Sequence, residues 1–461
     1  MLFSSNVFLF AYLPIVLAVY FLSPRWLRNP VLLLVSLFFY GWGEPVYLIL
    51  MIGTIVLNYV FGAWIHIRKT RGKPAGGVLA AAVAVNLLLL GYFKYAGFIL
   101  KSLQAVLPWL DQVTLPEISL PIGISFYIFQ SMSYVIDVYR DDAPVQRNVL
   151  TFGTYVSLFP QLIAGPIVRY RDVAEQMDHR RESISGFASG VLLFITGLAK
   201  KVLIANTMGN LWNLLQAQTG TLVAWMGIVA YSLQIYFDFS GYSDMARGLG
   251  RMIGFEFLEN FNYPYISASI TEFWRRWHIS LSTWFREYVY IPLGGNRRGL
   301  ARQILNLLVV WLLTGFWHGA SWNFVLWGLY YAVFLIAEKV FWLKLLDKLP
   351  KCVRHVYTLV IVVLGWALFY FEDMALLSGF LIRLFTPAAS SPMGIRLLIG
   401  YLPMYLIAFV ACTPAGVRLL SAKKDTVLVR YCRILLAAAA LMLCVAALVS
   451  QSYNPFIYFR F

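Results

Sequence analysis

The sequence is poor in charged residues. Only 13% of its 461 residues are charged and 60% are apolar, whereas soluble domains are roughly a quarter charged and half apolar. A soluble fold has no interior large enough to hide that much apolar surface. The low charge content therefore excludes a soluble globular protein and favours an integral membrane protein.

Cysteine is scarce and scattered. The four cysteines lie in the last quarter of the chain, without a CxxC pair or a neighbouring histidine cluster. Neither a disulfide framework nor a cysteine metal site is indicated, and we expect buried, small apolar residues. No third acid at ligand spacing joins Asp238 and Asp244, so no metal is indicated there either. The cysteines are Cys352, Cys412, Cys432 and Cys444.

Long polar linkers, low-complexity segments and internal repeats with matching motifs are also missing. The simple interpretation is a single membrane-embedded domain over residues 1–461. The first apolar segment begins at Leu2 without a basic n-region, and no small-residue cleavage site follows it. We therefore expect an uncleaved helix at the N-terminus rather than a signal peptide.

What the chain does contain is a series of apolar runs of bilayer length, about 20 residues each. Clear examples, with their apolar flanks, are 7–22, 78–90, 353–371 and 434–449. This length rule predicts an all-α polytopic membrane protein with roughly eleven to thirteen transmembrane or re-entrant helices.

The net charge of +16 has a membrane explanation. In a soluble protein it would suggest nucleic acid, but here the basic residues gather in short loops such as 66–73, so we expect lipid contacts and no nucleic-acid partner. Arg25 and Arg28 precede a turn, 41–45, that carries only an acid. The positive-inside rule therefore places the N-terminus outside.

Three regions are polar, charged or rich in Gly and Pro although apolar runs flank them, so they must be shielded from lipid. Region 157–169 holds two prolines and a glycine, which favour a broken or re-entrant helix. Region 234–245 places Asp238 and Asp244 near membrane depth. Region 272–302 combines Trp and Arg at a density typical of the membrane–water boundary, where we expect interfacial helices.

Of the five histidines, three lie beside basic loop residues and are expected to be solvated. His318 is different, because the surrounding stretch 312–327 is apolar, aromatic and of helical length. An imidazole with a pKa near about 6.5 suits removal of a proton from a hydroxyl, which makes that oxygen a nucleophile toward a thioester. The alternative is a core histidine that hydrogen-bonds between helices. The three loop histidines are His66, His179 and His355.

If the whole stretch around His318 is one helix, Thr314 and Trp322 lie on the same face as the imidazole. Gly315 and Gly319 would then leave room for another molecule beside the ring.

His278 is the other histidine in a Trp-rich setting, and helical spacing would align it with Trp274 and Ser282. It would either orient the substrate and share the proton traffic, or serve as an amphipathic residue of the aromatic belt. Arg275 and Arg276 would either meet the phosphates of a carrier such as coenzyme A or contact anionic lipids.

The remaining polar motifs also have two interpretations. Asp238 and Asp244 would either position a base or a cation, or pack helices through hydrogen bonds to the hydroxyl groups of 240–243, which we expect. The stretch 294–298, two glycines followed by Asn-Arg-Arg, would form either a phosphate-binding nest or a cytoplasmic turn, and we expect the turn.

At these residues the sequence resembles the membrane-bound O-acyltransferase family, and within it the bacterial branch named for the alginate O-acetylation protein AlgI. The resemblance covers nearly the whole chain, and several independent stretches match in the right order. They are 121–127, 159–160 with 164–169, 238–244, 273–299 and 317–322.

This resemblance implies a ring of membrane helices around a thinned centre, with a tunnel that lets a cytoplasmic acyl thioester reach an acceptor on the other face, and a catalytic core of about 119–345. The histidine of the family's Trp-His-Gly motif falls on His318 as catalytic base, and the second polar position falls on His278. Tunnel or donor contacts would come from Trp317, Ser321, Trp322, Trp274, Arg275, Arg276, Trp277 and Asp238.

The resemblance also implies an activity, namely O-acetylation of an extracellular polysaccharide such as alginate, carried out in the bacterial plasma membrane through a separate extracytoplasmic, esterase-like transferase. Acetyl-CoA or another acetyl thioester would be the co-substrate, with no permanently bound cofactor. A sister branch transfers D-alanine to teichoic acid, so acyl or D-alanyl transfer to teichoic acid, lipid or protein is the alternative enzyme. A transporter is the alternative from another class, although no inverted repeat supports it.

Overall fold

The computed structural model describes residues 1–114, 119–162, 165–416, 427–450, 454 and 457. These residues form helices joined by turns and loops, with no strand among them. They divide into two compact units, Met1–Phe194 with Met245–Leu258, and Ile195–Asp244 with Glu259–Phe461. The long helix α12, Thr221–Met252, contributes to both units. The expected single domain, with its catalytic core and its ring of helices, stays a prediction.

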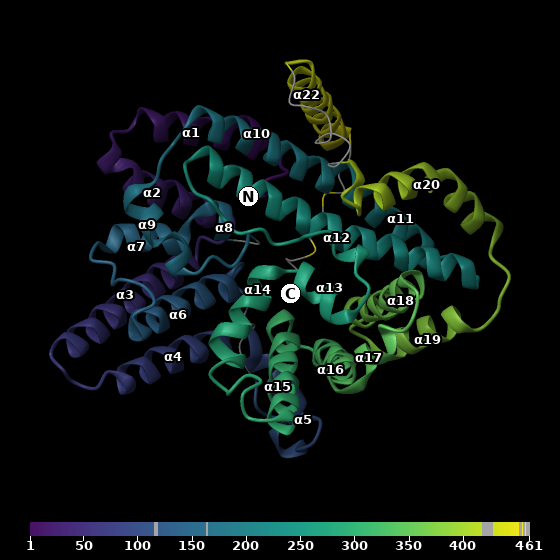
Figure 1. The fold of residues 1–461 in the computed structure, drawn as a ribbon, viewed down its shortest axis with the longest axis horizontal. Helices are drawn as coiled ribbons and strands as arrows, with labels where there is room; N and C mark the ends of the chain where they lie inside the picture. The colour runs from purple at the N-terminus through teal and green to yellow at the C-terminus, as the bar shows by residue number, and fades with distance from the viewer. Residues whose placement is uncertain (115–118, 163–164, 417–426, 451–453, 455–456, 458–461) are drawn as a thin grey trace. The chain divides into compact units, whose positions relative to one another are not determined.

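In the first unit, α6 is the buried centre (Figure 1). Tyr134 on α6 fills the groove beside Gly62 of α3, where an added methyl would overlap its ring. The Tyr134 ring also packs on Phe152 of α7 and Tyr170 of α9, with centroids 4.4 and 4.9 Å away. The helices of this unit are α1 Leu13–Leu22, α2 Arg28–Gly41, α3 Leu48–Thr70, α4 Gly76–Leu90, α5 Ala96–Gln104, α6 Ile124–Arg140, α7 Val149–Ser157, α8 Phe159–Leu162, α9 Tyr170–His179 and the first part of α10 Ile184–Ala199.

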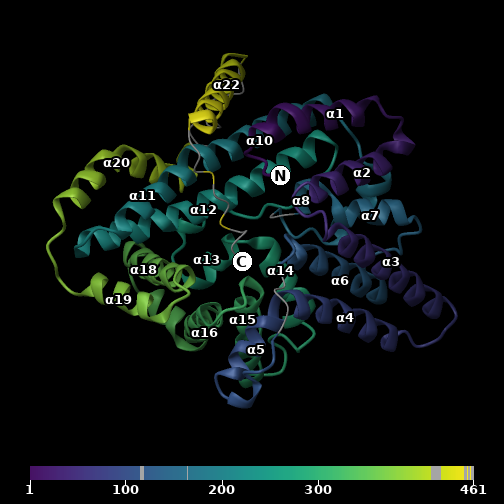
Figure 2. The same cartoon turned by 180° about the vertical axis from the view of Figure 1, so that it is seen from behind.

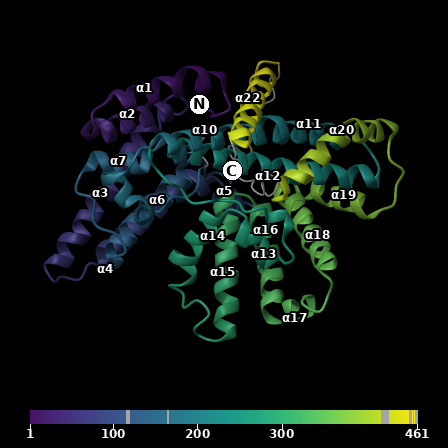
Figure 3. The same cartoon turned by 45° about the horizontal axis from the view of Figure 1, so that its top comes forward.

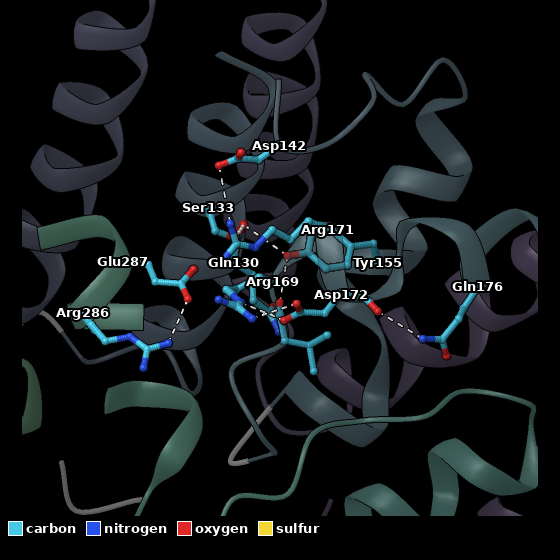
Figure 4. Close-up of polar contacts among 11 residues, drawn as sticks. Gln130, Ser133, Asp142, Tyr155, Arg169, Arg171, Asp172, Gln176, Arg286 and Glu287 are labelled. Atoms are coloured by element: carbon cyan, nitrogen blue, oxygen red, sulfur yellow. Dashed lines mark hydrogen bonds and ion pairs between the residues drawn. The ribbon is translucent and has the colours of Figure 1, made fainter. Parts of the chain in front are cut away.

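The predicted break in 157–169 is confirmed. Helix α7 ends at Ser157, and α8 has only four residues. Ile163 and Ala164 lie outside the described residues. After these two residues, the carbonyl of Val168 accepts a hydrogen bond from Tyr155 Oη at 2.9 Å, and Arg169 binds Asp172 through two N–O contacts of 2.8 Å (Figure 4).

The second unit holds helices that lie side by side, α15 with α16 and α16 with α18 (Figures 2 and 3). Between α12 and α15 the chain forms only short helices. The elements are π-helix η5 Lys200–Ala205, α11 Asn206–Gln216, α12, 3₁₀-helix η6 Pro264–Ile266, α13 Ile270–Arg276, α14 Ile279–Phe285, π-helix η7 Arg286–Tyr290, α15 Leu300–His318, α16 Trp322–Ala337, π-helix η8 Glu338–Trp342, α17 Leu343–Leu346, α18 Lys351–Tyr370, α19 Met374–Phe385, α20 Pro392–Ala411 and α22 Val427–Ser450.

The all-α polytopic membrane fold is confirmed. Within the described part of the chain, nine helices are long and apolar enough to cross a membrane. Two shorter apolar helices, Phe8–Leu22 and Met374–Phe385, bring the number to the lower end of the predicted range. Region 272–302 contains α13, α14 and η7, each of seven residues or fewer, so these helices are too short to span.

Glycines let α15 and α16 touch at their backbones. A methyl on Gly315 would overlap the carbonyl oxygen of Phe324, and a methyl on Gly328 would overlap that of Trp311. Small residues at such a crossing allow close van der Waals packing, which drives helix association in lipid. The close approach fixes the end of α15, where His318 lies.

Gly315→Ala is therefore expected to lower the stability of the folded protein by about 1–3 kcal/mol, because the new methyl has only backbone to push against. Thermal unfolding of the purified protein in detergent measures it. The matched control is Gly53→Ala on α3, where no atom lies within 4 Å of an added methyl, and where alanine favours the helix by up to about 1 kcal/mol. Equal loss of stability in both variants would contradict the packing described.

Candidate active site

His278 lies in the turn between α13 and α14. Ser269 caps α13, accepting a hydrogen bond from the backbone N–H of Glu272 at 3.0 Å, and the helix ends at Arg276. His278 then adopts a left-handed conformation, with φ of 45°. The expected helical alignment of His278 with Trp274 and Ser282 is therefore wrong, because the left-handed residue separates two helices, α13 and α14.

Asn260 holds this turn from a neighbouring segment. Its side-chain Oδ1 lies 3.2 Å from His278 Nδ1 and accepts from Ser280 through both the backbone N–H, at 3.1 Å, and Oγ, at 3.0 Å. Its backbone carbonyl accepts from Ile279 N at 3.0 Å. The Phe239 ring packs edge-on against the imidazole, with centroids 4.7 Å apart. The imidazole is thus fixed on two sides.

Burial keeps His278 uncharged. Only 1% of the residue is exposed, and this burial lowers its pKa from 6.5 to about 3, because removing water disfavours the imidazolium. At neutral pH the side chain is a neutral imidazole, with one nitrogen that can accept a hydrogen bond.

His318 is the last residue of α15. Its ring packs edge-on against Trp317, Trp327 and Phe369, at 5.1, 5.0 and 5.4 Å between centroids, and 5% of the residue is exposed. The condition of a single helix over 312–327 is not met, because Gly319 is extended and a new helix starts at Trp322.

The space predicted beside Gly315 and Gly319 is also absent. The carbonyl of Phe324 covers Gly315, and the ring of Phe324 covers Gly319, so α16 occupies that side of the histidine. Trp322 is 58% exposed and faces away from the core.

Both histidines line one cavity of about 240 Å³. The α15 contribution is a single helical face that ends at His318, and α13, α14 and η7 supply the opposite wall. Exposed Arg275 and Arg286 also line it, so the cavity extends from two buried imidazoles to two solvent-accessible guanidinium groups. The lining residues are Thr271, Trp274, Arg275, His278, Leu281, Ser282, Phe285, Arg286, Tyr290, Leu307, Val310, Trp311, Thr314, His318 and Leu335.

The other predicted contact residues have different positions. Trp274 and Arg275 line the cavity with the two histidines. Arg276 instead forms an ion pair with Glu272, with Nε and Oε1 3.0 Å apart. Trp277 packs on Trp366, 4.7 Å between centroids, as part of the core. Trp317 contacts both imidazoles, with its centroid 6.0 Å from that of His278 and 5.1 Å from that of His318, while Ser321 and Trp322 are not among the lining residues.

Asp238 belongs to a separate buried ion pair. Its Oδ1 lies 2.6 Å from Lys201 Nζ, each side chain is 2% exposed, and Oδ2 accepts from the backbone N–H of Ile457 at 2.9 Å. Asp244 pairs with Lys200 at 2.6 Å. The expected packing of the aspartates through neighbouring hydroxyls is thus corrected, because lysines from η5 neutralise both carboxylates.

Three further expectations concern His355, the cysteines and the stretch 294–298. His355 is half-buried, with Nδ1 3.1 Å from the carbonyl of Ser267, so it is not a fully solvated group. Cys412 and Cys444 are buried, but Cys352 and Cys432 are exposed. The stretch 294–298 forms the expected turn, and Asn306 donates to the carbonyl of Gly295 at 2.9 Å.

Comparison with known proteins adds an independent line of evidence. The sequence profile of the MBOAT, membrane-bound O-acyltransferase family, matches residues 139–377. The probable alginate O-acetylase AlgI of Pseudomonas putida is 41% identical over 487 residues, covering 100% of both chains. The chain belongs to the membrane-bound O-acyltransferase family.

Two further relatives of this O-acyltransferase cover most of its length. The probable alginate O-acetylase AlgI of Azotobacter vinelandii is 47% identical over 380 residues, 81% of this chain and 76% of the relative. The peptidoglycan O-acetyltransferase of Helicobacter pylori is 35% identical over 412 residues, 81% of this chain and 78% of the relative. The resemblance stated from the motifs is therefore confirmed.

Several residues of the candidate site were not predicted. Asn260 lacked a signal beyond its place near the Trp-rich region. Glu338 accepts from the backbone N–H groups of Ile270 and Thr271, at 2.7 and 2.8 Å, and so anchors the start of α13. An acid inside the apolar run 322–346 was a visible signal, because an intramembrane charge requires a partner. Arg286 had a weaker sequence signal, namely its position in the Trp- and Arg-rich region 272–302.

Because the pKa of His278 is lowered, the folded O-acyltransferase should lose stability as the pH falls from 6.5 toward 3. In that window the unfolded chain binds a proton at this histidine and the folded chain does not, which lowers the free energy of unfolding by about 1.4 kcal/mol per pH unit. Above pH 6.5 neither state binds this proton, so the stability is fully present. The thermal unfolding temperature in detergent, measured from about pH 8 to about pH 4, should therefore fall less steeply for His278→Gln than for the wild type. His179→Gln, at an exposed histidine, should follow the wild type, and parallel curves for all three proteins would contradict the account.

Proposed function

We propose that this O-acyltransferase moves an acetyl group from a cytoplasmic thioester donor across the membrane, for O-acetylation of an extracellular polysaccharide such as alginate. The cavity shared by His278 and His318 carries the proposal, because it brings two imidazoles and two exposed arginines to one space. The bacterial plasma membrane is the proposed location. An extracytoplasmic, esterase-like partner is proposed to pass the acetyl group on to the polymer.

The proposed chemistry needs no group beyond this chain and its substrates. His318 takes the proton of the acceptor hydroxyl while that oxygen attacks the thioester carbonyl. The carbon–sulfur bond then breaks, and the leaving thiolate recovers the proton from His318. His278, neutral and fixed on Asn260, holds the reacting group in line through a hydrogen bond.

The arginines suit a donor that carries phosphate. Arg275 is exposed, and Arg286 has a 61% exposed side chain whose Nη2 lies 3.1 Å from Glu287 Oε1 (Figure 4). Guanidinium groups bind phosphate through paired hydrogen bonds. Acetyl-CoA or another acetyl thioester with a phosphate is the donor that this arrangement favours. Arg276 does not line the cavity, so Arg275 is the more suitable of the two neighbouring arginines.

The size of the cavity favours a short acyl group. Its volume of about 240 Å³ is below the roughly 300–1,000 Å³ of pockets for drug-sized ligands. Large rings close it, since Trp274 packs on Trp311 with centroids 4.7 Å apart. An acetyl or D-alanyl thioester suits this space better than a fatty acyl chain. Acyl or D-alanyl transfer to teichoic acid, lipid or protein remains the alternative activity.

The acceptor is proposed from the relatives. Two of them are named alginate O-acetylases and one a peptidoglycan O-acetyltransferase. All three names describe acetyl transfer to a polysaccharide or glycan polymer, which supports acetyl over other acyl groups. The buried charges that also suit a transporter are accounted for by ion pairs, such as Lys201 with Asp238.

His318→Ala is expected to lower the rate of acetyl transfer by about 10²–10⁴-fold, the contribution of a general base. His278→Ala should lower it by about 10–100-fold, because orientation is lost but the base remains. Membranes that contain the acceptor polymer, supplied with radiolabelled acetyl-CoA, report the rate as label in the polymer. His179→Ala, outside the cavity, is the matched control. Wild-type transfer by a folded His318→Ala protein would remove that histidine from the chemistry.

Trp311→Ala is expected to change the donor preference, because it removes a large ring from the cavity wall. Butyryl-CoA should improve relative to acetyl-CoA by about tenfold or more, the usual value of one or two methylenes in a pocket. Competition between the two donors in the same membranes measures the ratio. Trp322→Ala, at an exposed tryptophan outside the cavity, should leave the ratio unchanged. An unchanged ratio in Trp311→Ala would mean that the acyl group binds elsewhere.

A further inference from the structure

The segment 260–262 runs beside the His278 turn and binds it through the backbone. The backbone N–H of Asn262 donates to the carbonyl of Arg276 at 2.9 Å, and Ile279 N donates to the carbonyl of Asn260 at 3.0 Å. Arg276 Nη1 also donates to the carbonyl of Asn262 at 3.1 Å. These backbone contacts hold the turn in addition to the bonds that the Asn260 side chain accepts from Ser280.

The Asn260 side chain has a separate role, set by which of its atoms faces the imidazole. The Asn260 side-chain atom that faces the imidazole accepts a hydrogen bond from the backbone N–H of Ser280 at 3.1 Å. A backbone N–H only donates, so this atom must be the amide oxygen rather than the nitrogen. An oxygen without a proton then faces His278 Nδ1 at 3.2 Å. For the pair to be bonded, Nδ1 must carry the proton.

We propose that Asn260 is a positioning residue for acyl transfer, which fixes His278 as the Nδ1–H tautomer and so leaves the lone pair on Nε2. This inference rests on the proposed function of His278, which it deepens. The side chain of Asn260 binds His278 and Ser280, of which only His278 lines the cavity, and Asn260 is not itself among the lining residues. It acts through the imidazole.

The chemistry explains why the tautomer matters. A neutral imidazole has one donor and one acceptor nitrogen, and the hydrogen bond at one nitrogen decides which is which. If the proton moved to Nε2, the same ring would offer a donor where a hydroxyl or water needs an acceptor. The buried position strengthens this choice, because a hydrogen bond is electrostatically stronger in a low-dielectric interior than in water. In other enzymes, the wrong tautomer of a catalytic histidine costs orders of magnitude in rate.

The test reads the tautomer directly. The chain has five histidines, so uniform ¹⁵N-histidine labelling gives a small number of ring signals, and His278→Gln identifies those of His278. Solid-state NMR of the full-length protein in lipid should show protonated Nδ1 and unprotonated Nε2. Asn260→Leu, of similar volume but without an acceptor, should lose this pattern and lower kcat for acetyl transfer by about 10–100-fold, with KM for the donor little changed. Asn260→Asp keeps the acceptor oxygen and should keep Nδ1–H and most of kcat.

The matched control is Asn262→Ala. Asn262 is the same residue type on the same segment, but it binds Arg276 only through its backbone, so both signals and rate should match the wild type. A folded Asn260→Leu protein with Nδ1 still protonated would overturn the proposal, as would loss of Nδ1–H in Asn260→Asp. Wild-type transfer by His278→Ala would instead refute the proposed role of His278, while the NMR result on Asn260 would stand by itself.

Discussion

A polar group inside a membrane protein has no water to bind, so it must find its partner in the chain. This constraint governs the second unit, Ile195–Asp244 with Glu259–Phe461. His278 is hydrogen-bonded to Asn260, Asp238 forms an ion pair with Lys201, and Glu338 accepts hydrogen bonds from the first N–H groups of α13. Leaving such a group unpaired costs several kcal/mol, so each pairing also fixes the segment that supplies it. The paired polar groups of this unit therefore also hold its segments in place.

The constraint also explains how the cavity keeps its shape. Lipid gives helices no hydrophobic reason to associate, so α15 and α16 depend on close backbone contact at Gly315 and Gly328. That contact sets the end of α15 and the position of His318. On the other wall, Glu338 holds α13, and the short α13 carries Trp274 and the His278 turn. Two anchors on one continuous helix, α16 with η8, thus bring the two imidazoles to one cavity.

The sequence predicts the parts of this arrangement that depend on composition and local pattern. Apolar run length gave the polytopic helical fold, and two prolines with a glycine gave the break after Ser157. His318 and His278 were identified because a histidine among apolar and aromatic residues is rare. Their cavity could not be derived from spacing, since His278 adopts a left-handed turn and α15 stops at His318. The partners of Asp238 and His278 lie 37 and 18 positions away in the chain, and no local period links them.

The central claim is that the acyl group of the donor meets both imidazoles in the cavity between α13, α14 and α15. A cryo-electron microscopy structure of the protein in lipid, with a non-hydrolysable thioether analogue of acetyl-CoA, tests it most directly. The account predicts the acetyl end of the analogue beside His318 and His278, with its phosphates near Arg275 and Arg286. An analogue bound elsewhere, with this cavity filled by protein side chains, would contradict it.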